Sequence, residues 1–83
     1  MPMKPLYGVY VFLTPETARS LKPDLYGGER ALTVDEALQS FMRRFHVFYV
    51  ETALVMSVSE QGEITGGAFR LQVSCDLKKQ EVV

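Results

Sequence analysis

The chain has 83 residues, of which 47% are hydrophobic and 23% are charged, with nine lysines and arginines against ten aspartates and glutamates. This composition excludes a largely disordered chain, and the net charge of -1 lacks the basic excess typical of general nucleic-acid binders. One cysteine and one histidine exclude an intrachain disulfide and argue against a four-ligand zinc site, so we expect neither a metal nor another cofactor.

The length predicts one small α+β domain over residues 1–83, with flexible ends at residues 1–5 and 78–83. The start of the chain lacks the long apolar segment of a secretory leader, and no apolar run is long enough to cross a bilayer as a helix. We therefore expect a cytoplasmic protein with no membrane partner. Cys75 falls on the apolar row of the last strand, where it is expected to act as a small buried hydrophobe.

The first third of the chain predicts a strand and a short helix. Residues 6–13 are β-branched and aromatic, which is typical of a strand, and both of its faces are apolar. Thr14 suits the N-cap of a helix that runs from Pro15 to Leu21 and is ended by Pro23. The glycine pair Gly27–Gly28 then predicts a loop over residues 24–30.

The main helix is predicted between Thr33 and about Phe45. Thr33 and Glu36 have the spacing of a capping box, in which the first residue caps the helix and the fourth bonds back to it. Apolar residues then recur at helical spacing: Val34, Leu38, Phe41, Met42 and Phe45. This pattern predicts an amphipathic helix that covers one face of a sheet.

The last third predicts a β-hairpin, because two alternating apolar rows flank a turn signal. With Gln61-Gly62 as a two-residue turn, Leu54 is expected opposite Phe69, and the even positions from Phe48 to Val58 face the helix. This register needs no bulge and leaves Gly66–Gly67 inside a strand, where something could approach the backbone closely.

These elements predict a three-stranded, mainly antiparallel sheet in the order β-α-α-β-β, with one main helix on one face. The strand over residues 6–13 could pair in parallel with the strand that begins near residue 47, or in antiparallel fashion with the last strand. Its two apolar rows allow both arrangements.

One helix covers only one face of a sheet, so we expect a second, exposed apolar face. The residues assigned to this interface are Tyr7, Val9, Val11, Val47, Tyr49, Ala53 and Val55, and the first strand could instead contribute its other apolar row, Leu6, Tyr10 and Phe12. An apolar patch of this kind with a polar rim usually marks an interface. The alternative is that the loop from Asp24 to Leu32 folds over it.

The favoured interpretation is a small non-enzymatic protein-interaction or regulatory module, such as an inhibitor or accessory protein of a phage or mobile element. Its partner would be a second copy of the chain or another protein. The alternatives are a ligand-binding protein or enzyme with a pocket between protomers, and a nucleic-acid-binding module. No catalytic residue is assigned, since His46 has no second histidine or nucleophile pattern beside it.

The Met1-Pro2 start and the coarse order of elements resemble those of small tautomerases. That resemblance implies an N-terminal proline that acts as a general base. The chain departs from the pattern in two places, because Met3-Lys4-Pro5 delays the first strand and Pro23 breaks the helical segment.

Overall fold

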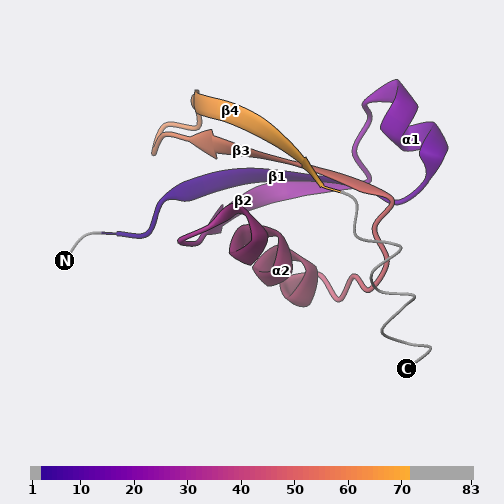
Figure 1. The fold of residues 1–83 in the computed structure, drawn as a ribbon, viewed down its shortest axis with the longest axis horizontal. Helices are drawn as coiled ribbons and strands as arrows, with labels where there is room; N and C mark the ends of the chain where they lie inside the picture. The colour runs from indigo at the N-terminus through magenta and orange to yellow at the C-terminus, as the bar shows by residue number, and fades with distance from the viewer. Residues whose placement is uncertain (1–2, 72–83) are drawn as a thin grey trace.

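A computed structural model describes the backbone of residues 3–71 and the side chains of residues 3–67. Its elements are β1 (Leu6–Phe12), α1 (Pro15–Ser20), β2 (Leu25–Arg30), α2 (Val34–Arg44), β3 (Thr52–Val58) and β4 (Ile64–Leu71). The strands form one antiparallel sheet in the order β2-β1-β3-β4. Helix α2 lies across one face of the sheet and α1 lies at one end of it (Figure 1). The predicted α+β class is thus confirmed, with a fourth strand added.

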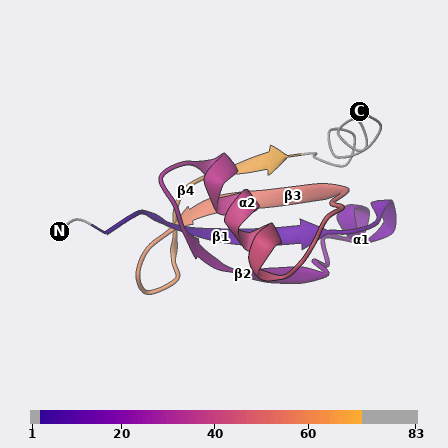
Figure 2. The same ribbon diagram turned by 90° about the horizontal axis from the view of Figure 1, so that it is seen from below.

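The core forms where α2 packs on the sheet, and Figure 2 shows this helix crossing the face seen in that view. The buried stripe of α2 consists of Ala37, Leu38, Phe41 and Met42. Beneath it lie the small or branched side chains of β1 and β3: Val9, Val11, Ala53 and Val55, all 0% exposed. Large helix side chains over small strand side chains allow the two layers to approach at native packing density.

Strand β2 corrects the prediction of a loop over residues 24–30. It pairs with β1 along its whole length, with Tyr10 opposite Tyr26. Its glycines indicated a turn, but Gly27 lies in the strand because α2 approaches it closely. A Cβ atom at Gly27 would lie 3.4 Å from both the Phe41 ring and the Arg44 guanidinium. Glycine inside a strand often marks such an approach.

The pairing of β1 also differs from both predicted alternatives. β1 lies antiparallel to β3, with Val9 opposite Val55, and it does not pair with β4. The reason is topological: β2 returns antiparallel beside β1, and α2 then carries the chain back across the sheet. β3 therefore enters on the free side of β1, running in the same direction as β2.

The β3–β4 turn has three residues, not the predicted two. Ser59 pairs with Glu63 through a 2.7 Å backbone hydrogen bond, and the Ser59 hydroxyl accepts hydrogen bonds from the N–H groups of Gln61 and Glu63. Gly62 has φ +86°, the left-handed conformation that closes a three-residue turn of this type. A two-residue turn of type I′ would also need Gln61 at positive φ, a conformation that glutamine disfavours.

The longer turn and a bulge shift the register of the hairpin. Leu54 lies opposite Arg70 and Val55 opposite Phe69, so the predicted pairing of Leu54 with Phe69 is wrong. Between the pairs Val58–Ile64 and Met56–Ala68, β3 has one residue and β4 has three, Gly66 and Gly67 among them. A Cβ at Gly66 would lie 3.1 Å from the Ser57 Cβ, which explains the glycine there.

Both helices begin as predicted, while α1 ends at Ser20, one residue before the predicted Leu21, and α2 ends at Arg44, next to the predicted Phe45. Thr14 caps α1 in a capping box completed by Thr17, and the Thr33 hydroxyl accepts a hydrogen bond from the Glu36 N–H at 3.1 Å. Each helix is followed by a residue in the left-handed conformation, Leu21 (φ 57°) and His46 (φ 56°). This position closes a Schellman motif, and it usually holds glycine because other residues are strained there.

We expect Phe41→Ala to destabilise the chain by about 3–5 kcal/mol, since it removes a fully buried ring from the centre of the core. Urea unfolding followed by circular dichroism would measure the loss. The matched control is Phe48→Ala, because Phe48 is 74% exposed and its removal leaves no cavity. Equal losses in the two variants would contradict this packing.

We expect His46→Gly to stabilise the chain by about 0.5–1 kcal/mol, because glycine adopts the left-handed conformation without the strain that a side chain brings. The His46 N–H bonds to the Arg43 carbonyl and the next N–H bonds to the Met42 carbonyl, and glycine preserves both contacts. A higher urea midpoint would bear this out. A lower midpoint would show that the imidazole itself stabilises the end of α2.

Candidate protein-interaction face

The structure places the predicted interface residues mainly in the core. Tyr7, Val9, Val11, Ala53 and Val55 are at most 9% exposed beneath α2, and Val47 packs against the same cluster. Tyr49, in the connection between α2 and β3, is 43% exposed. The prediction placed the helix on the wrong side of the sheet. The physical reason is volume, because the bulky stripe of α2 fits the row of smaller strand residues.

The apolar face left uncovered by α2 is therefore the opposite one, here called the open face. It consists of Leu6, Tyr10, Tyr26, Leu54, Met56, Val58 and Ile64. Tyr26 and Ile64 are 69% and 63% exposed, and the other members are half-buried by their neighbours. Within residues 3–71, no helix lies over the middle of this face (Figures 1 and 2).

Two tyrosines form the part of the open face that lies over β1 and β2. The rings of Tyr10 and Tyr26 stack across the β1–β2 pair, with centroids 6.2 Å apart and planes inclined by 20°. The Tyr10 ring also leans over Gly8, where a Cβ would lie 3.5 Å from it. Because glycine leaves this space, the ring lies flat on the sheet and presents a broad apolar surface.

Helix α1 borders one end of the open face and creates a hollow there. The hollow has a volume of about 90 Å³ and is lined by Phe12, Ala18, Leu21, Thr52 and Leu54. The Asp24 carboxylate fixes α1 beside it by accepting hydrogen bonds from the Leu13 N–H at 2.7 Å and the Thr17 hydroxyl at 2.9 Å. The lining contains no titratable side chain, and its surface is divided almost equally between polar and apolar atoms.

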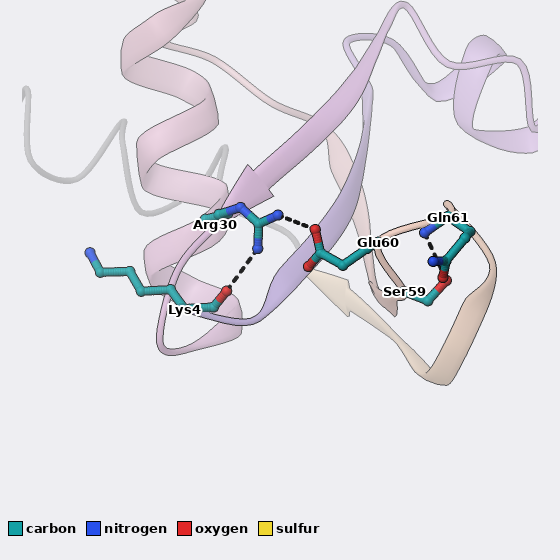
Figure 3. Close-up of polar contacts among 5 residues, drawn as sticks. All are labelled: Lys4, Arg30, Ser59, Glu60 and Gln61. Carbon is teal, nitrogen blue, oxygen red and sulfur yellow. Dashed lines mark hydrogen bonds and ion pairs between the residues drawn. The ribbon is translucent and has the colours of Figure 1, made fainter. Parts of the chain in front are cut away.

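An ion pair borders the other end of the open face. The Arg30 guanidinium contacts the Glu60 carboxylate in the β3–β4 turn and donates a 3.1 Å hydrogen bond to the Lys4 carbonyl (Figure 3). The hydrogen bond from Arg30 lowers the pKa of Glu60, and the hydrogen bond to Glu60 raises the pKa of Arg30. The two charges neutralise each other, so this rim carries no net charge from the pair.

A second ion pair lies on the α2 side of β2 and was not predicted from the sequence. Glu29, which falls in the loop predicted over residues 24–30, is only 9% exposed, and its carboxylate lies 2.8 Å from the Arg44 guanidinium. That contact lacks the angle of a hydrogen bond. Arg44 also lies 4.8 Å from the centroid of Phe45. Arg44 thus ties the end of α2 to the edge strand instead of lying free on a solvated helix face.

The pKa of Glu60 is lowered in the folded chain, so this group contributes stability above its unfolded pKa of about 4.3. That contribution is lost as the pH falls through the lower folded pKa. We expect Glu60→Gln to reduce the urea midpoint at pH 7 and to have less effect as the pH drops below about 4. Glu63→Gln, in the same exposed turn, is the control. A Glu60→Gln difference that does not change with pH would contradict the ion pair.

Several residues considered in the sequence do not enter this face. His46 is exposed beyond the end of α2, and Pro2 and Cys75 lie outside the described residues. Over the described part of the chain, no three histidine, cysteine, aspartate or glutamate side chains gather as metal ligands would. No helix there is long and apolar enough to span a membrane. Comparison of the chain with family models, curated proteins and solved structures gives no match.

Proposed function

We propose that this chain is a non-enzymatic protein-interaction module that self-associates through the open face. The observation that carries the proposal is the apolar character of this face, which no helix of residues 3–71 covers. An antiparallel sheet with one solvated face usually alternates apolar and polar residues. Here Leu6, Tyr10, Leu54 and Met56 occupy the positions of the two central strands where polar residues would be expected.

A second copy of the chain suits this face because the face is apolar and the charged pair at one end of it is balanced. A two-fold interface places each patch against itself, so a net charge would repel its own image. Arg30 and Glu60, the charged pair at the rim, already balance within one chain. Two sheets can then pack face to face at about 10 Å with their side chains interleaved.

The size of the chain also favours self-association. A domain of this length buries only about 60% of the surface of its unfolded chain, and its stability is correspondingly small. Pairing two open faces would remove further apolar surface from water, at roughly 25 cal/mol for each Å² buried. We infer a regulatory or accessory role over an enzymatic one, because the hollow beside the face is lined by apolar groups and the hydroxyl of Thr52.

We expect the chain to have a mass in solution of twice its 9.4 kDa, measured by light scattering over a concentration series. Tyr26→Lys should shift the mass to that of a monomer, because self-association would bury an unpaired charge in the apolar face. Tyr26 is 69% exposed, so the fold should survive, which circular dichroism would check.

The matched control is Phe48→Lys. Phe48 is an aromatic residue of similar exposure, 74%, in the connection between α2 and β3, and its replacement should leave the dimer intact. A monomeric wild type at every concentration would refute self-association. A dimer lost in Phe48→Lys but kept in Tyr26→Lys would place the interface on another surface.

A further inference from the structure

Leu21 combines two features that oppose folding stability. Its backbone is in the left-handed conformation (φ 57°, ψ 35°), where a leucine side chain is strained and glycine is the usual residue. Its side chain is also 69% exposed, so it gains little from burial. Strained residues that persist in a fold are often found at functional sites, and such an outlier is grounds for a functional hypothesis.

The position of Leu21 connects it to the open face. It lines the hollow of about 90 Å³, together with Phe12 and Ala18 on one side and Leu54 of the open face on the other. The chain therefore carries an exposed aliphatic side chain beside a hollow that is lined by apolar side chains and Thr52 and that no described side chain fills. A two-fold axis that passes between the Leu21 side chain and the hollow beside it would bring each Leu21 against the hollow of the other copy.

We infer that Leu21 is the anchor residue of self-association and that it inserts into the hollow of the second copy, whose own Leu21 enters the first. This inference rests on the dimer proposed above and names the contact that holds it. The size of the hollow selects the side chain. A closed cavity of about 150 Å³ accepts benzene, so a hollow of about 90 Å³ that is partly open to solvent has room for an aliphatic side chain.

An anchor of this kind explains why the strained leucine is useful. Interface energy is concentrated in a few side chains that fill pockets and exclude water. Replacing Leu21 with glycine would relieve the strain in the isolated chain and remove the anchor from the dimer. Stability of the monomer and affinity of the dimer should then change in opposite directions, which loss of a simple structural contact would not produce.

The experiment measures both quantities in Leu21→Gly. The dimer dissociation constant comes from light scattering or sedimentation over a concentration series, and the urea midpoint is measured at concentrations where the chain is monomeric. We expect a dissociation constant raised at least tenfold, together with a higher monomer midpoint. Ala18→Leu, which fills the hollow from within the same chain, should raise the dissociation constant without removing Leu21.

The matched control is His46→Gly, which makes the same backbone change at φ 56° after α2. It should raise the midpoint and leave the dissociation constant unchanged. A Leu21→Gly chain that dimerises like the wild type overturns the anchor, while loss of the dimer in Tyr26→Lys still supports the open face. A wild type that dimerises and is unaffected by both Leu21→Gly and Tyr26→Lys overturns the anchor and the proposed face together.

Discussion

The packing of α2 onto the sheet is the contact on which the rest of the structure depends. The ring of Phe41 reaches the backbone of Gly27 and so brings the helix close to the edge strand. A helix carrying such bulky side chains needs small partners, and Ala53 and Val55 supply them. Because one helix covers one face, packing α2 on Ala53 and Val55 leaves the larger side chains of β3, Leu54 and Met56, on the uncovered face. The core and the open face are thus consequences of a single volume match.

This dependence explains what could be predicted from the sequence and what could not. The two helices follow from local chemistry, since the caps at Thr14 and Thr33 and the apolar period identify them without tertiary contacts. The buried face of the sheet was harder to predict, because both faces of β1 and β3 are apolar. The alternation of apolar and polar residues along these strands therefore does not reveal which row is buried. The existence of an exposed apolar face was expected, but its residues were drawn from the wrong row. The smaller volumes of Ala53 and Val55 were the available signal.

The edge strand β2 shows a different limit of sequence reasoning. Its glycine pair indicates a turn when only local preferences are considered, and the close approach of α2 that requires Gly27 is a long-range contact. Two consecutive residues then fix the end of this strand to distant elements on opposite sides, Glu29 to Arg44 and Arg30 to Glu60. The Arg30–Glu60 pair is exposed, and pairs of this kind generally contribute only about 0–1 kcal/mol, so its value is positional. The two ion pairs keep a glycine-rich edge aligned with the sheet.

The bulge in β4 has a consequence for how the length of this chain can vary. β4 has three residues between Ile64 and Ala68, whereas β3 has one between Met56 and Val58, so β4 has two extra residues. Because two is an even number, odd and even residues of β4 face the same sides of the sheet before and after the bulge. An odd surplus would interrupt this alternation at the bulge itself. A change of two residues at Gly66–Gly67 therefore keeps the alternation along β4 as it is, whereas a change of one residue needs a bulge of another kind to absorb it.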